Sequence, residues 1–148
     1  MSEAPLLAIV VETTIEAPPA HVWDVLTSEV TLPRWLGAMD YRAVVGTTFF
    51  MQEDPALRSA HDTSGATHCT ILAMDAPGKF VFSWFQPGTP ETVVEFHLFP
   101  TAGGGTQLRL IHDGWDQFVP DAVRGYYEQV AEDWRATAVP ALKRAASR

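Results

Sequence analysis

Two adjacent residues near the end of the chain, His112 and Asp113, have the side chains of an acid/base pair. Histidine titrates near neutral pH, and a carboxylate can orient its ring. On a β-strand, however, neighbouring side chains point to opposite faces of the sheet. We therefore expect Asp113 to serve a turn at Gly114, because an Asp-Gly step accepts positive φ and Asp bonds nearby backbone.

His112 is then the inward-facing candidate for catalysis, if the protein is an enzyme at all. An acid/base site needs titratable groups that converge on one point, and the candidate neighbours are His68, Tyr127 and Asp116. An inward histidine is more often a hydrogen-bonding residue of a core or a pocket than a catalytic group. The interpretation favoured here is a binding protein rather than an enzyme.

The other chemistry-bearing residues predict no cofactor and no metal. The five histidines show neither HxH nor HExxH spacing, and TAGGGT lacks the lysine of a phosphate-binding loop. A nucleophile motif of the form G-x-S-x-G is absent. The single cysteine, Cys69, follows only one basic side chain closely, that of His68, and we expect it to be an inert strand residue.

Composition and charge are typical of one globular domain. Of the 148 residues, 47% are hydrophobic and 19% are charged, which is unlike a disordered chain. Ten basic against eighteen acidic residues give a formal charge of −8, which argues against nucleic acid and membrane partners. One cysteine and no signal peptide favour the cytoplasm. We expect a single domain over residues 1–148, as a monomer or homodimer.

The sequence pattern predicts a strand, two short helices and then a run of strands. Residues 6–16 alternate as a strand, and the prolines in 17–27 and 31–37 suit the first turns of short helices. Thr31 is a candidate helix cap, and Gly37 is the expected stop. Six further strands, separated by Gly- and Pro-containing turns, predict an antiparallel sheet over 41–46, 47–53, 66–75, 79–86, 92–99 and 106–113.

A long amphipathic helix is predicted from about residue 120 to 146, because apolar residues recur every three or four positions. It would be roughly 40 Å long, enough to cross a sheet. Pro140 is expected to bend this helix or to break its last turns. The segment 53–65 is the longest irregular stretch, and we expect it to be a binding loop or a lid.

These elements predict an α+β fold in which the curved antiparallel sheet wraps around the C-terminal helix. The apolar face of a twisted sheet needs a cover, and only this helix is large enough. We expect a cavity between them, although the same side chains could instead fill a solid core. Strand and helix parity selects these ligand-binding candidates: Phe49, Met51, Phe82, Trp84, Phe96, Leu98, Leu110, His112, Tyr127, Val130 and Trp134.

Four segments, in their order and spacing, resemble the AHSA-like branch (homologues of the activator of heat-shock-protein ATPase) of the START-related SRPBCC superfamily: IEAPPAHVWDVLTSEVTLPRWLG, VVGTTF, FVFSW and GGGTQLRLIHDGW. The resemblance runs from about Ile15 to Trp134. It implies the helix-grip, START-like fold with a hydrophobic cavity. The eukaryotic co-chaperones of this branch carry a second, chaperone-binding domain that is not expected here, and Cys69 stands where many relatives have glycine.

The predicted function is binding of a hydrophobic or amphipathic small molecule, such as a lipid, an aromatic metabolite or a polyketide-like compound, in the internal cavity. One alternative is a cyclase- or hydratase-type enzyme on the same scaffold, with His112 as acid or base. Another is a module that interacts with a chaperone or regulator, which requires an exposed apolar patch.

Overall fold

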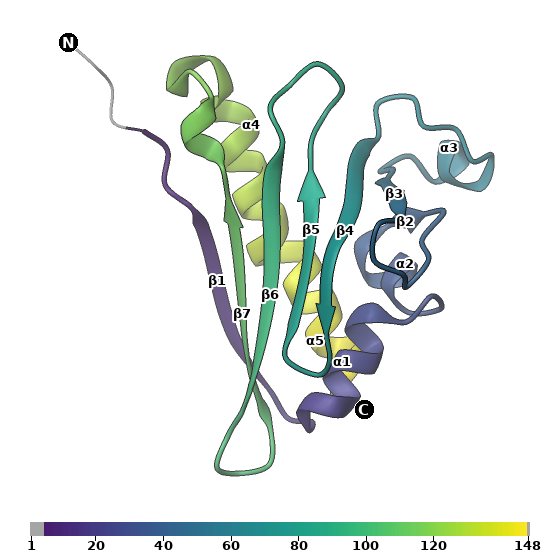
Figure 1. The fold of residues 1–148 in the computed structure, drawn as a ribbon, viewed down its shortest axis with the longest axis vertical. Coiled ribbons are helices and arrows are strands. Elements are labelled where there is room, and N and C mark those ends of the chain that lie inside the picture. The colour runs from purple at the N-terminus through teal and green to yellow at the C-terminus, as the bar shows by residue number, and fades with distance from the viewer. Residues whose placement is uncertain (1–4, 148) are drawn as a thin grey trace.

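The computed structural model describes residues 5–147, which form a curved antiparallel sheet packed around a long C-terminal helix (Figure 1). The sheet has seven strands in the order β1-β7-β6-β5-β4-β3-β2. They are β1 (Ile9–Ile15), β2 (Ala38–Met39), β3 (Thr48–Met51), β4 (Thr67–Asp75), β5 (Lys79–Trp84), β6 (Thr92–Pro100) and β7 (Thr106–Asp113). This arrangement confirms the predicted α+β helix-grip fold.

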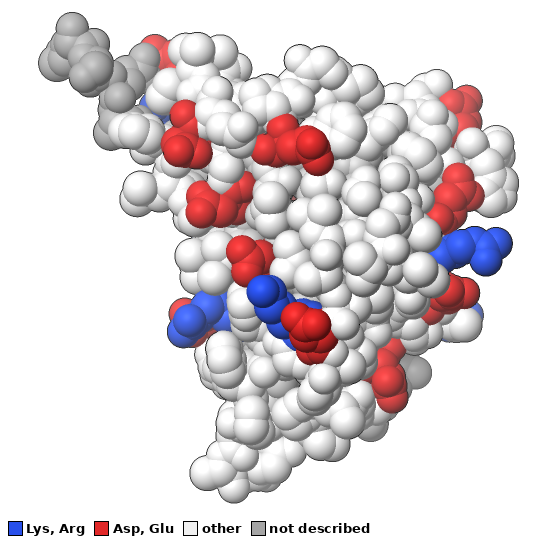
Figure 2. Space-filling view, viewed as in Figure 1, with Lys and Arg blue, Asp and Glu red and all other residues white. Residues whose placement is uncertain are grey.

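Side chains alternate between core and surface along the central strands, because one face of the sheet packs on the helix. In the β6–β7 pair, Phe96 lies opposite Leu110 and Val94 lies opposite His112, and all four are buried. On the face of the molecule seen in Figure 2, Asp and Glu side chains are scattered and Lys and Arg side chains are few, in keeping with the negative net charge.

The two short helices, α1 (Pro19–Thr27) and α2 (Leu32–Leu36), follow β1 as predicted. Gly37 ends α2 with a φ of 72°, which confirms it as the stop. Thr31 does not cap the helix with its side chain, and that prediction is wrong. Its hydroxyl instead donates to the carbonyl of Val25 at 2.6 Å, because the chain turns back onto the end of α1.

The strand predicted over residues 41–46 is absent from the structure, and this is a further correction. The short strand β2 precedes it and pairs with β3. Tyr41 is buried, and its hydroxyl donates to the carbonyl of Thr27 at 2.6 Å. This bond ties the segment to the end of α1, so residues 41–46 form turns and bends rather than a ladder.

The C-terminal helix is continuous, but it changes its winding in the middle. It consists of α4 (Pro120–Asp133), the π turn η2 (Trp134–Ala138) and α5 (Val139–Ala146). In the π turn the amide of Val139 donates to the carbonyl of Trp134, five residues back. Pro140, which has no amide hydrogen, is the second residue of α5, and the wider turn before it lets the helix continue. The last turns are therefore not broken.

Two further short helices complete the described residues, namely α3 (Pro55–Ser59), between β3 and β4, and the 3₁₀ turn η1 (Trp115–Gln117), after β7. Within residues 5–147, every helix is too short or too polar to cross a membrane.

Candidate ligand-binding cavity

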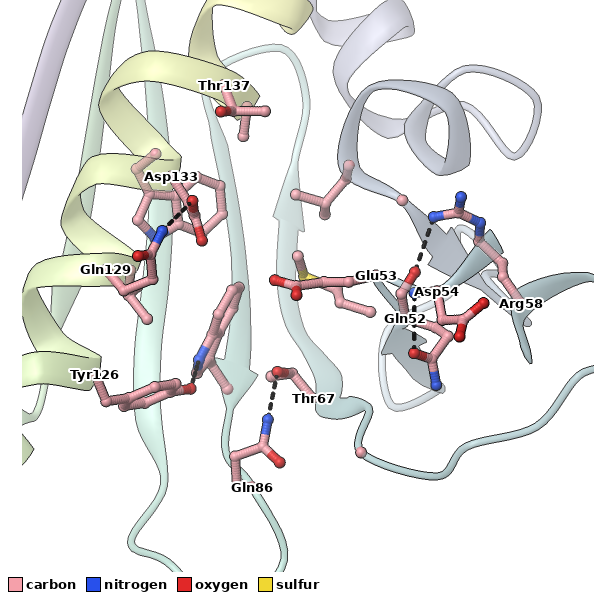
Figure 3. A pocket seen from close by; sticks show the side chains of 18 of the residues that line it. Gln52, Glu53, Asp54, Arg58, Thr67, Gln86, Tyr126, Gln129, Asp133 and Thr137 are labelled. Carbon is pink, nitrogen blue, oxygen red and sulfur yellow. Dashed lines mark hydrogen bonds between the residues drawn. The ribbon is translucent and has the colours of Figure 1, made fainter. Parts of the chain in front are cut away.

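A cavity of about 720 Å³ lies between the C-terminal helix, the β3 and β5 side of the sheet, and the loop that carries α3 (Figure 3). This volume is within the range of small-molecule pockets. The cavity is lined by Trp35, Leu36, Gly37, Met51, Gln52, Glu53, Asp54, Arg58, Gly65, Thr67, Trp84, Gln86, Tyr126, Gln129, Val130, Asp133, Trp134, Thr137 and Ala138.

The apolar part of the wall is built around two indole rings. Trp84 is the last residue of β5, Trp134 is the first residue of the π turn, and their ring centroids are 5.4 Å apart. Trp84 Nε1 donates to the hydroxyl of Tyr126, and Trp134 Nε1 donates to Nδ1 of His112, each at 3.1 Å. Because both N–H donors are bonded within the protein, the rings offer the cavity aromatic surface rather than hydrogen-bond donors.

His112 lies behind these indoles and is fully buried. Its Nδ1 accepts from Trp134, so Nε2 carries the proton and donates to Oγ1 of Thr92 at 2.7 Å. The Thr92 hydroxyl in turn donates to the carbonyl of Trp84 at 2.8 Å. Burial lowers the pKa of His112 to about 3, which keeps the ring neutral at physiological pH.

The inward orientation of His112 is confirmed, but the expected neighbours His68, Tyr127 and Asp116 are wrong. The ring contacts aromatic side chains and Thr92, and it is not part of the cavity wall. The expected side chains lie elsewhere, because His68 packs between Phe50 and Phe85, the hydroxyl of Tyr127 bonds Leu7, and Asp116 is exposed. Asp113 serves the turn as predicted, since its Oδ1 accepts from the amide of Gly114 at 2.8 Å.

The structure separates the predicted ligand-binding residues into wall and core. The cavity wall includes Met51, Trp84, Val130 and Trp134. The residues that are buried but do not line the cavity are Phe49, Phe82, Phe96, Leu98, Leu110 and His112. Phe96 supports the wall from behind, with its ring centroid 5.9 Å from that of Trp134.

Tyr127 is also outside the cavity, because it occupies another side of the helix. Its hydroxyl donates to the carbonyl of Leu7 at 2.8 Å, and its ring packs against Trp115. The preceding residue, Tyr126, lines the cavity instead. The apolar periodicity selected the buried stripe of the helix, of which Val130 and Trp134 reach the cavity, and the adjacent, more polar stripe supplies the other helix residues of the wall.

The polar part of the wall comes from residues that the sequence did not single out. Those on the helix are Tyr126, Gln129, Asp133 and Thr137. Their spacing of three or four positions is the signal of one helical face, and this signal was available in the sequence. Those on the loop are Gln52, Glu53, Asp54 and Arg58. Only the loop itself was predicted to take part in binding.

The loop over residues 53–65 is held in place as a wall by side-chain hydrogen bonds. The buried Gln52 donates from Nε2 to the carbonyls of Asp62 and Ser64, at 3.0 and 2.8 Å. Arg58 Nη1 donates to the carbonyl of Gln52 at 2.8 Å. Gating of the cavity by this loop stays a prediction.

The ionised groups of the wall are three carboxylates, Glu53, Asp54 and Asp133, and one guanidinium, Arg58. Asp54 caps α3, and Asp133 accepts from Nε2 of Gln129 at 2.9 Å. Glu53 has no hydrogen bond or ion pair within residues 5–147. Figure 3 shows its side chain extending from the loop toward the middle of the cavity, with Asp133 on the helix side.

The single cysteine, Cys69, does not line the cavity. Cys69 is fully buried, and burial raises the pKa of its thiol, so little thiolate forms at neutral pH. In the part of the chain that the structure describes, no three His, Cys, Asp or Glu side chains are grouped so that they could hold a metal ion.

Comparison with known proteins gives a family match and several similar folds. The family model described as activator of Hsp90 ATPase homolog 1-like protein matches residues 16–145. A protein of Mesorhizobium loti is 27% identical with a TM-score of 0.73, over 93% of this chain and 94% of that chain. A protein of Bacillus halodurans is 25% identical with a TM-score of 0.73, over 99% and 100%. An Hsp90 activator from Plasmodium falciparum, 17% identical over 90% and 91%, has the same fold with a TM-score of 0.70. No curated protein matches.

Proposed function

The chain belongs to the family of activator of Hsp90 ATPase homolog 1-like proteins, and we propose that it binds a hydrophobic or amphipathic small molecule in the cavity beside its C-terminal helix. The observation that carries the proposal is the composition of this 720 Å³ space. Indole and aliphatic side chains form one part of its wall, and polar side chains form the rest. Small-molecule sites combine apolar surface with a few polar groups in this way.

The aromatic wall is fixed before any ligand arrives, which favours binding. Trp134 is held by its hydrogen bond to His112, and Trp84 is held by its bond to Tyr126. Side chains that are already ordered lose little rotamer freedom when a ligand packs against them. Each apolar contact then contributes about 25 cal/mol per Å² of surface removed from water.

The geometry favours binding over catalysis by His112. A general acid or base must come within about 3 Å of the reacting group, or reach it through one water. Both nitrogens of His112 are bonded to protein groups, and burial lowers the pKa of its ring to about 3. The similarity to the Plasmodium falciparum Hsp90 activator, at 17% identity, supports the fold. It does not identify a surface of this chain that would bind a chaperone.

Titration with the neutral probe pyrenylmethanol tests this function, with two tryptophan variants as a matched pair. Met51→Trp places a bulky ring in the cavity wall, whereas Leu72→Trp adds the same ring at a position that is 48% exposed and outside the wall. We expect the probe to bind the wild type and Leu72→Trp equally, and Met51→Trp at least about tenfold more weakly. Equal binding to all three proteins would show that the ligand site is elsewhere.

Native mass spectrometry of freshly purified protein, followed by denaturing extraction, then identifies the natural ligand. The proposal expects the wild type to carry a small-molecule adduct or to acquire one from a lipid and metabolite extract. The Met51→Trp variant is expected to carry less of that mass than Leu72→Trp.

A further inference from the structure

The polar wall of the cavity presents unpaired amide oxygens. Both indole nitrogens of the aromatic wall are already bonded, as described above. Gln86 directs Nε2 to the hydroxyl of Thr67 at 2.9 Å, and Gln129 directs Nε2 to the carboxylate of Asp133 at 2.9 Å (Figure 3). The side-chain oxygens of these two glutamines have no partner within residues 5–147. These oxygens can accept hydrogen bonds from a ligand.

The charged side chains of the wall also favour a ligand group that is positively charged. Glu53 on the loop and Asp133 on the helix approach the cavity from two sides. The guanidinium of Arg58 donates to the backbone carbonyl of Gln52, and it is outnumbered by the carboxylates. The potential in such a space attracts cations and repels anions, and nearby low-dielectric walls strengthen it.

The aromatic surface complements a cation as well. Trp84 and Trp134 have their N–H groups bonded to Tyr126 and His112, which leaves ring surface as their contribution to the wall. A cation near the face of an indole is attracted by the negative face of the ring. Carboxylates, amide oxygens and indole faces thus favour the same kind of ligand group.

From these features we infer that the cavity selects a ligand with an apolar, ring-containing body and a protonated amine. The body covers the indoles, and the amine lies near Glu53 and Asp133. A fatty acid or another carboxylate of similar size binds more weakly, although the cavity is largely apolar. This inference rests on the binding function proposed above and names its ligand class.

Isothermal titration calorimetry with three matched probes tests the selection: pyrenylmethylamine, pyrenylmethanol and pyrenecarboxylate. They share one aromatic body and differ in charge. We expect the amine to bind about fivefold to tenfold more tightly than the alcohol, and the carboxylate to bind more weakly than the alcohol by a similar factor. The preference is expected to shrink at high salt, because the carboxylates are in contact with solvent.

The double variant Glu53→Gln/Asp133→Asn removes the charges and keeps the shapes of the side chains. We expect it to bind the amine only as tightly as the alcohol, with the affinity for the alcohol within about twofold of the wild type. The control variant Asp24→Asn/Glu128→Gln changes the net charge equally at exposed positions outside the cavity wall. It is expected to keep the preference for the amine.

The outcomes separate this inference from the function on which it rests. If the alcohol binds the wild type more tightly than Met51→Trp, but amine and carboxylate bind equally, the charge selection is wrong and the binding function stands. If none of the three probes binds the wild type more tightly than Met51→Trp, the binding function fails and the inference fails with it.

Discussion

Replacing His112 by glutamine removes a buried titratable group and can keep the hydrogen bonds that the imidazole ring makes. The glutamine oxygen can accept from Trp134 Nε1, and its amide nitrogen can donate to the hydroxyl of Thr92, as Nδ1 and Nε2 do in the wild type. The variant therefore tests the protonation of His112 separately from its packing.

The sign and size of the effect follow from the pKa of His112, which burial lowers from 6.5 to about 3. Between these two values the unfolded chain binds a proton at this position and the folded protein does not. The free energy of unfolding is therefore unaffected by this group above pH 6.5 and falls as the pH drops toward 3. At about pH 4.5, the wild type is expected to lose about 2 to 3 kcal/mol that His112→Gln does not lose.

Urea unfolding, followed by tryptophan fluorescence at about pH 7 and about pH 4.5, measures this difference. Other titrating groups are common to both proteins, so they cancel when the two pH dependences are subtracted. With a slope of about 2 kcal/mol per molar urea, the wild-type midpoint is expected to fall by about 1 M more than that of the variant. Equal acid sensitivity of the two proteins would contradict this prediction, because it would mean that His112 titrates normally in the folded state.

Two further predictions concern the described core and one hairpin. Cys69 is expected to react with a thiol reagent only after denaturation, because it is fully buried and burial raises its pKa; prompt stoichiometric labelling of the native protein would contradict this. Gly105→Ala is expected to lower the free energy of unfolding by about 1 to 3 kcal/mol, because a Cβ there would lie 2.9 Å from the carbonyl oxygen of Ile15. Gly103→Ala, whose Cβ meets nothing within 4 Å, is the control in the same urea unfolding experiment, and equal losses would argue against the steric explanation.

The fold could be predicted from the sequence where the local residue pattern alone determines the structure. Alternating side chains in residues 92–99 and 106–113, with a glycine-rich turn between them, define the hairpin that the structure contains. The segment 41–46 has similar β-forming composition, but it forms no strand. There the hydroxyl of Tyr41 bonds the end of α1, and a sequence pattern does not reveal such a tertiary contact.

The cavity was only partly predictable, because parity gives the direction of a side chain and not the space around it. Phe49 is buried and Met51, on the same face of β3, is half-buried, and only Met51 reaches the cavity. On the helix, Tyr126 and Tyr127 differ by about 100° in direction. The choice between them depends on Trp84, which lies 42 residues earlier in the chain and donates to Tyr126.

A crystal structure with bound pyrenylmethanol would show directly whether a ligand occupies the space between the C-terminal helix and the loop over residues 53–65. We expect the aromatic rings of the probe to lie against Trp84 and Trp134, with Met51 in contact. A structure in which the probe binds elsewhere, or in which helix and loop close together and fill the space with their own side chains, would contradict this expectation.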